Sequence, residues 1–323
     1  MGDFPDRREE KFQNAGSIYT CRRPNQTHPW EKSRLQHFSV IARHTEGEMK
    51  LALCSEVVRE LDFAAQCAFA ASVGYDGLEL APMQLSKDPH RLPDARRAEV
   101  RGIAADHGVE ITGLYCLMHA PAGLSITSSD PAVRALTLDV MERLCDLCAS
   151  LGAKYLVHGS SQYRKLDPAD AGGSRARGIE AFARAARFAA AAGVTYFIEP
   201  LRPSRTAFIN TVAEAAAIVD AIGSPALKTM LDCCSASEAE TEPVVNLLDR
   251  WLPTGKIGHI HANDANQRGP GEGDLRFSEI VAALKRGGFT GVIGVEPFAF
   301  EPDGRTCAAR AVGYMRGVME AMS

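Results

Sequence analysis

The feature that most limits the fold of this chain is an alternation of strand-like and helix-like segments that repeats eight times. Alanine-rich amphipathic segments, such as GIEAFARAARFAAAAG, separate short runs of β-branched and aromatic residues. The expected strands are residues 51–54, 77–81, 110–117, 154–159, 194–200, 227–232, 256–262 and 291–297. Strands that alternate with helices form parallel sheets, and eight such units close into a barrel. We therefore expect an α/β protein with the (β/α)8 TIM-barrel fold.

The first part of the chain does not share this alternation. Residues 1–48 are polar, and their apolar residues do not recur at the spacing of a helix or a strand. A regular apolar pattern begins abruptly at Met49. We predict an irregular N-terminal extension over 1–48 and one (β/α)8 barrel catalytic domain over 49–323. The extension is interpreted either as an arm that wraps the domain or as the result of an upstream translation start that the native gene does not use.

Composition and charge exclude several classes of partner. The formal net charge of −4 supplies no basic field for a nucleic-acid backbone. No run of about 18 uncharged apolar residues occurs, which argues against a membrane span. The N-terminus also lacks the apolar core of a secretory signal. We expect a cytoplasmic protein whose partner is a small molecule.

Polar residues stand at the ends of the last four expected strands. They are Glu199, Asp232, His261 and Glu296. Consecutive members of this set are about one strand-and-helix unit apart in the sequence. Because the carboxyl ends of barrel strands meet at one face, where the chemistry of such barrels takes place, the four side chains can converge on one point.

Three carboxylates and one imidazole form a mostly oxygen ligand set for a divalent cation. This set favours Mn²⁺ or Mg²⁺, with Co²⁺ or Zn²⁺ as further options. Without a cation, three carboxylates at one point would repel one another. Each residue alone could instead cap a strand or a helix, but four such residues on consecutive strands predict a metal site.

Other strand ends offer candidates for substrate binding. His158 lies at the end of the fourth expected strand and His119 just past the third, and Glu79 either orients substrate or simply completes the second. His259 lies two residues before His261 and therefore on the same face of the strand. It either supports His261 or is an ordinary core histidine, and we favour the core role.

At these positions the chain resembles the xylose-isomerase-like barrel superfamily of sugar isomerases and epimerases. Within it, the chain is most similar to the ketose 3-epimerases, such as D-tagatose and D-psicose 3-epimerase. The resemblance covers roughly residues 49–320, and its most specific motifs are IEPL, MLD, GHIHANDANQRGPGEG and GGFTGVIGVEPF, around the four strand-end residues.

The resemblance implies roles for these residues. The four would bind a divalent metal, most often Mn²⁺, and Glu199 and Glu296 would exchange protons with the substrate from opposite faces. Related barrels are commonly dimers or tetramers, so we expect a homo-oligomer.

The chain departs from the ketose 3-epimerase pattern where that family holds the far end of the sugar. Arg205, Ser235 and Gln267 stand at the positions of a glutamate, a histidine and an arginine. This change argues against a free ketohexose as the substrate. Arg202 and Arg205 are interpreted either as a site for a carboxylate or phosphate, or as solvated loop residues. Arg268, at the start of a glycine-rich loop, is a further substrate-binding candidate.

The sequence therefore predicts a divalent-metal-dependent epimerase or isomerase of a keto-sugar or related polyol. The reaction would pass through a metal-stabilised enediolate, with Glu199 and Glu296 as the acid/base pair. The alternative is a metal-dependent lyase or dehydratase acting on a keto-sugar, keto-inositol or 3-keto-glycoside. A DNA endonuclease would need a histidine-rich site and a basic face, and a sugar-binding protein would not need two proton-transfer groups.

Overall fold

A computed structural model describes residues 48–322 and shows a closed barrel of eight parallel strands in sequential order. The strands are β1 Lys50–Cys54, β2 Gly77–Leu80, β3 Glu110–Leu114, β4 Tyr155–His158, β5 Thr195–Ile198, β6 Leu227–Asp232, β7 Ile257–Ala262 and β8 Val292–Val295. Pairing of β1 with β8 closes the barrel. The predicted TIM-barrel fold and its eight strands are confirmed, with differences only at strand ends. The predicted extension lies outside the described residues, except for Glu48.

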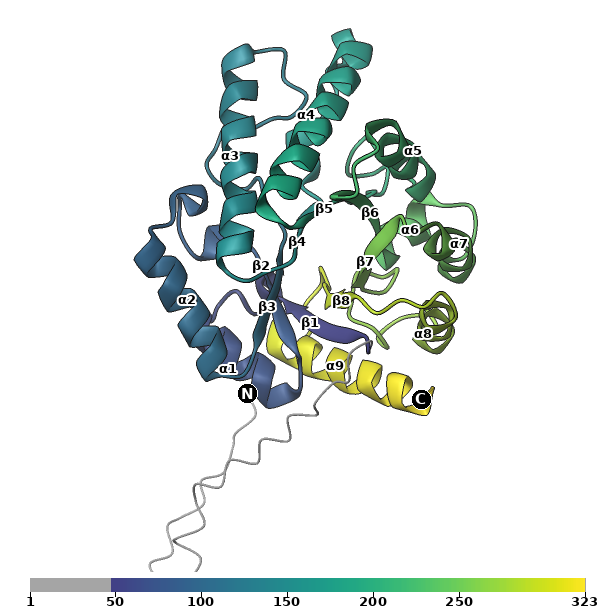
Figure 1. The fold of residues 1–323 in the computed structure, drawn as a ribbon. Helices are drawn as coiled ribbons and strands as arrows, with labels where there is room; N and C mark the ends of the chain where they lie inside the picture. Colours follow the sequence, from purple (N-terminus) through teal and green to yellow (C-terminus); the bar gives the residue numbers. More distant parts are fainter. Residues whose placement is uncertain (1–47, 323) are drawn as a thin grey trace, which may run out of the picture. The chain divides into compact units, whose positions relative to one another are not determined.

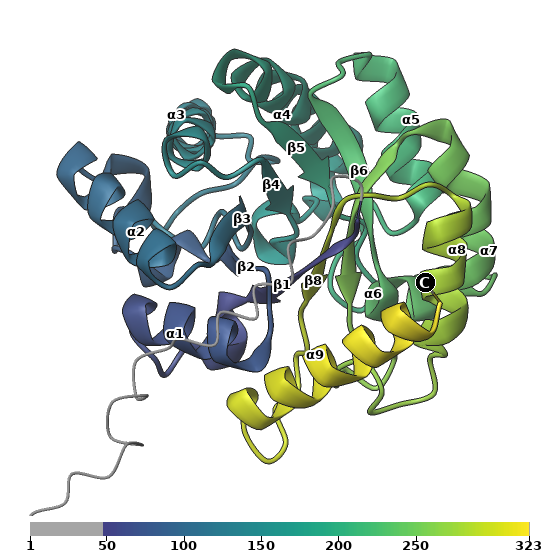
Figure 2. The same cartoon turned by 60° about the horizontal axis from the view of Figure 1, so that its bottom comes forward.

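Helices surround the barrel (Figures 1 and 2). They are α1 Phe63–Val73, α2 Asp94–Asp106, α3 Pro131–Ser150, α4 Ala171–Ala192, α5 Val212–Ile222, α6 Cys233–Ala239, α7 Val244–Trp251, α8 Phe277–Arg286 and α9 Gly304–Ala321. The long helices α3 and α4 lie side by side in both views. Over the described part of the chain, no helix combines the length and the apolar character that a membrane crossing requires.

Local sequence signals fix where the helices begin and end. Asp130 caps α3, because its carboxylate accepts a hydrogen bond from the Ala132 backbone N–H at 2.8 Å, and Pro131 occupies the first helical position. Gly193 ends α4 in the left-handed conformation, with φ of 70°, where most side chains would be strained. The chain then enters β5 within two residues.

The packing of β5 illustrates how the barrel positions the residues that follow each strand. Tyr196, Phe197 and Ile198 are all buried. Burial of side chains of this size stabilises the fold by about 1.5–3 kcal/mol each. Because these side chains anchor the strand, the backbone of the next residue, Glu199, leaves the barrel at a fixed place.

Candidate active site

The structure brings the four strand-end residues together at the carboxyl end of the barrel. Asp232 and His261 are the last and the penultimate residues of β6 and β7, while Glu199 and Glu296 directly follow β5 and β8. Each offers one ligand atom, and these atoms all lie within 4.8 Å of one another. The first three are buried and Glu296 is partly buried, so the cluster is largely withdrawn from water.

Two atoms of this cluster face each other without a well-directed hydrogen bond. His261 Nδ1 lies 2.8 Å from Glu296 Oε2, and both atoms are buried without a hydrogen-bond partner. Glu199 Oε1 is 3.7 Å from the same Nδ1. These contacts leave three carboxylates around a single imidazole, and buried carboxylates that lie close together repel one another unless they share a positive charge. One imidazole and three carboxylates that aim at a common centre fit a divalent cation.

The electrostatics of the cluster lead to the same conclusion. Burial raises the pKa of Glu296 to about 8, and the charges of Glu199 and Asp232 add to this rise although His261 opposes it. Burial and the charge of Glu199 also raise the pKa of Asp232. A bound divalent cation would favour the deprotonated form of all three carboxylates.

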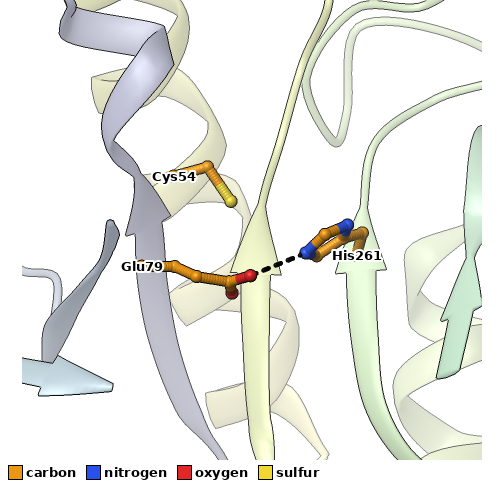
Figure 3. Close-up of side chains that lie close together, drawn as sticks. All are labelled: Cys54, Glu79 and His261. Carbon is orange, nitrogen blue, oxygen red and sulfur yellow. Dashed lines mark hydrogen bonds and ion pairs between the residues drawn. The ribbon is translucent and has the colours of Figure 1, made fainter. Parts of the chain in front are cut away.

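Glu79 fixes the orientation of the His261 ring. Its carboxylate Oε1 accepts a hydrogen bond from His261 Nε2 at 3.1 Å, which leaves Nδ1 facing the cluster. Figure 3 shows the carboxylate and the ring pointing toward each other, with Cys54 nearby. The sequence left open whether Glu79 orients substrate or only completes its strand, and in the structure it is fully buried beneath the cluster. It is therefore placed to hold a histidine rather than to touch a ligand.

His259 is a core histidine, as favoured from the sequence. It is fully buried, its ring stacks on Phe197 at 5.8 Å between centroids, and it packs against Tyr155. Its Nε2 lies 3.0 Å from Glu79 Oε2, which also accepts a hydrogen bond from the Tyr155 hydroxyl at 2.9 Å. The Glu79 carboxylate thus has partners on both oxygens deep in the barrel.

A cavity of about 470 Å³ lies next to the cluster and is lined by Glu199 and Glu296. Five of the predicted substrate-binding residues also line it: His119, Arg202, Arg205, Ser235 and Gln267. A larger cavity of about 810 Å³ is lined by residues at the opposite ends of the strands, such as Lys50 and Thr195. Barrel chemistry takes place at the carboxyl ends, so the smaller cavity is the candidate active site.

Two further predicted substrate contacts do not line this cavity. His158 is fully buried, and its Nδ1 lies 2.8 Å from the Tyr196 hydroxyl. Arg268 Nη2 lies 3.5 Å from Glu272 Oε1 and 3.4 Å from Glu301 Oε2. His158 thus turns into the protein, whereas Arg268, whose side chain is 31% exposed, pairs with two carboxylates. The geometry supports neither predicted contact with substrate.

The chain matches a known family across most of its length. Residues 67–317 match the family described as xylose isomerase-like TIM barrel. This chain belongs to that family. The family match agrees with the closed eight-strand topology.

Individual relatives of this xylose isomerase-like barrel are epimerases. D-psicose 3-epimerase of Agrobacterium fabrum is 30% identical over 238 residues, which are 71% of this chain and 76% of the relative. L-ribulose 3-epimerase of Methylomonas sp. is 26% identical over 240 residues, covering 72% and 78%. A crystal structure of D-psicose 3-epimerase with D-fructose superposes with a TM-score of 0.71 at 26% identity, covering 84% and 99% of the two chains. The xylose isomerase-like barrel described here is an enzyme of the epimerase and isomerase group.

Sequence reasoning about this barrel missed residues that support the cluster. The buried Asn263 side chain donates hydrogen bonds to Asp232 Oδ2 at 2.6 Å and to the Glu296 backbone carbonyl at 3.0 Å. Its Oδ1 accepts a hydrogen bond from the Cys234 N–H at 2.8 Å. One amide therefore ties together two candidate ligands from different strands. The signal was present in the sequence, because an asparagine directly after a buried strand needs partners.

Two residues near β4 support Glu199 and were also missed. A Cβ atom added to Gly159 would lie 1.6 Å from Glu199 Oε2, so the carboxylate occupies the space that a side chain would take. Arg164 is fully buried, and its Nη2 donates a hydrogen bond to the Glu199 backbone carbonyl at 2.7 Å. Both relationships depend on contacts between β4 and β5 that no local pattern reveals.

Proposed function

We propose that this barrel is a divalent-metal-dependent epimerase or isomerase of a keto-sugar or related polyol. The observation that carries the proposal is the convergence of one ligand atom each from Glu199, Asp232, His261 and Glu296 within 4.8 Å of one another. The names of the relatives support the substrate class, because D-psicose and L-ribulose are keto-sugars.

The metal would be held by Glu199, Asp232, His261 and Glu296. Mn²⁺ is proposed as the native ion, with Mg²⁺, Co²⁺ and Zn²⁺ as alternatives, because the ligand set is mostly oxygen. When bound, the cation supplies positive charge beside the oxygens of an enediolate, which lowers the barrier to its formation by several kcal/mol. Asn263 and Glu79 hold two of the ligands through hydrogen bonds.

Glu199 and Glu296 are the proposed proton-transfer groups. Both carboxylates line the cavity and therefore reach the space open to a substrate. One carboxylate oxygen removes the proton from the carbon next to the carbonyl, and a carboxylic acid O–H returns a proton. If both groups act on one carbon from opposite faces, that centre is inverted. If they act on adjacent carbons, the carbonyl moves along the chain and the product is an isomer.

The test is proton exchange in D₂O. The full chain is loaded with Mn²⁺ and incubated with D-fructose, D-tagatose and L-ribulose, and the products are followed by NMR and mass spectrometry. We expect deuterium to enter one carbon and an epimer or isomer of unchanged formula to accumulate. The E296Q variant and the metal-free protein should lack this activity. A product lighter by one water would instead identify a dehydratase, and full exchange in E296Q would remove Glu296 from the reaction.

We also propose that the protein is a cytoplasmic homo-oligomer, either a dimer or a tetramer. The support is the resemblance to barrels that commonly associate in this way. Light scattering on the purified chain tests the association, and fractionation of the native host tests the location. A monomer at micromolar concentration would contradict the first expectation.

A further inference from the structure

Three arginines line the candidate active-site cavity. Arg59 directly follows the short 3-10 helix η2 (Ser55–Val58), which comes after β1, whereas Arg202 and Arg205 lie in the loop between β5 and α5. All three line the cavity that also reaches Glu199 and Glu296. Cationic side chains from two separate loops thus face a space with an acidic cluster at one end.

Two of these arginines have no carboxylate partner in the described part of the chain. Some arginines elsewhere pair with a carboxylate, as in the contact of 2.6 Å between Arg316 and Asp76, whereas others, such as Arg134, donate only to backbone carbonyls. Among residues 48–322, no carboxylate oxygen lies within 4.0 Å of Arg59 or Arg205. Arg202 has a single distant one, Glu238 Oε2 at 3.8 Å. The donors of the Arg59 and Arg205 guanidinium groups are therefore available to a ligand, whereas Arg202 also donates to Cys234 Sγ at 3.7 Å.

The geometry of two of the guanidinium groups is set by aromatic rings. The Arg202 guanidinium carbon lies 5.7 Å from the centre of the Phe298 ring, and Arg202 Nη2 donates to Gln267 Oε1 at 3.2 Å. Arg59 lies over the Phe300 ring at 6.0 Å. A guanidinium that stacks on a ring keeps its in-plane N–H groups free, and these match the oxygens of a carboxylate or phosphate.

The carboxylates near these arginines are already engaged. Glu56 lines the same cavity, but its Oε1 accepts a hydrogen bond from Gln84 Nε2 at 2.9 Å. Glu238, the distant partner of Arg202, has a side chain that is 42% exposed. Contacts of this kind contribute little in water. An anionic ligand would therefore not have to displace a strong ion pair.

We propose that the substrate of this site carries a terminal anionic group, which Arg59, Arg202 and Arg205 bind. This inference rests on the proposed function, because it assumes that proton transfer takes place at Glu199 and Glu296. The cavity has the size of an ordinary small-molecule site. It would hold a keto-sugar with its reacting carbons at the cluster and a carboxylate or phosphate at the far end.

The test compares one sugar in neutral and anionic forms. The Mn²⁺-loaded full chain is assayed for deuterium exchange with D-fructose, D-fructuronate and D-fructose 6-phosphate. We expect kcat/KM for one of the two anions to exceed that for D-fructose by about tenfold or more. The preferred anion then distinguishes a carboxylate site from a phosphate site.

Variants of the two unpaired arginines assign the effect to this cavity. R59A and R205A should each raise KM for the preferred anion by about tenfold while changing the value for D-fructose less than threefold. Arg187 is exposed on α4 and does not line the cavity, so R187A is the matched control and should change neither. A higher kcat/KM for D-fructose than for both anions would overturn the inference and leave the epimerase function intact. An equal rise in KM for D-fructose and for the preferred anion in R59A and R205A would do the same.

A binding measurement decides the inference even if none of the three sugars reacts. Sorbitol, sorbitol 6-phosphate and D-mannonate lack the keto group and can be titrated into the Mn²⁺-loaded protein by calorimetry. Tighter binding of an anion than of sorbitol, weakened in R205A but not in R187A, would support the anion site and count only against the proposed reaction. Equal affinities for the three compounds, or an anion preference that R205A leaves unchanged, would overturn the anion site.

Discussion

The hydrogen bond between Glu79 of β2 and His261 of β7 spans the interior of the barrel at 3.1 Å. It passes close to Gly294 of β8, where an added Cβ would lie 2.7 Å from Glu79 Oε2 and 2.9 Å from a carbon of the His261 ring. The bond therefore depends on the missing side chain at position 294. It fixes which imidazole nitrogen faces the cluster, and such outer partners commonly tune metal affinity.

Loss of the Glu79 carboxylate should weaken metal binding. In E79A nothing holds His261 Nε2, so Nδ1 no longer points reliably at the cluster. We expect the Kd for Mn²⁺ to rise by about 10- to 100-fold, and E79Q, which keeps the volume and one acceptor, to have a smaller effect. Calorimetric titration of the metal-free protein gives the Kd, and circular dichroism checks the fold.

The control for the Glu79 variants is E99Q. Glu99 is an exposed residue of α2 that pairs with Arg96 at the surface. Its replacement should leave the Mn²⁺ affinity unchanged. An E79A protein that is folded and binds Mn²⁺ as tightly as the wild type would show that metal binding does not depend on the hydrogen bond between Glu79 and His261.

A methyl group at position 159 should lower kcat strongly without unfolding the barrel. In G159A the new Cβ would overlap Glu199 Oε2, which lies 1.6 Å away, so the carboxylate must move. A displacement of this size in a proton-transfer group costs about 100-fold or more in kcat. G102A is the matched control, because no atom lies within 4 Å of a Cβ there. Normal turnover in G159A would exclude Glu199 from the reaction.

The stability of the protein should depend on the metal. A cation that binds only the folded state at a concentration of 100 times its Kd stabilises that state by about 2.7 kcal/mol. We expect Mn²⁺ to raise the Tm of the EDTA-treated wild type. D232N, which lacks one candidate ligand charge, should show a much smaller shift in differential scanning calorimetry. Equal shifts in both proteins would mean that Mn²⁺ binds elsewhere.

The fold and the four residues of the cluster were predictable because both depend on periodic features of the sequence. Strand ends recur once per unit, and all of them meet at one face of a barrel. The backbone positions of Asp232 and His261 therefore had to lie near each other at that face. No side-chain detail was needed for that conclusion.

The direction in which other side chains point was not predictable. His158 ends a strand just as Asp232 does, yet it is fully buried away from the cavity, and Arg268 pairs with Glu272 and Glu301 instead of lining the cavity. Their direction depends on partners such as Tyr196 and Glu301, which lie far away in the sequence. The position of Arg59 in the cavity lining was not predictable either, because it depends on the conformation of the segment that follows β1.

The buried His158 should make the free energy of unfolding fall in mild acid. Burial, together with the charge of Arg164, lowers the pKa of His158 from about 6.5 to about 3. The folded protein therefore binds this proton less readily than the unfolded chain. Stability is complete above pH 6.5 and falls as the pH drops toward 3, at up to about 1.4 kcal/mol per unit from this one group.

Replacement of His158 isolates its share of that pH dependence. H158Q removes the titrating ring, while the remaining histidines titrate in both proteins and cancel in the comparison. Urea unfolding of the metal-free proteins at pH 7, 6 and 5 measures the two free energies. We expect H158Q to lose less stability than the wild type over this range, by about 1 kcal/mol per unit. Parallel curves would show that the His158 ring takes up its proton in the folded protein as readily as in the unfolded chain, which its complete burial argues against.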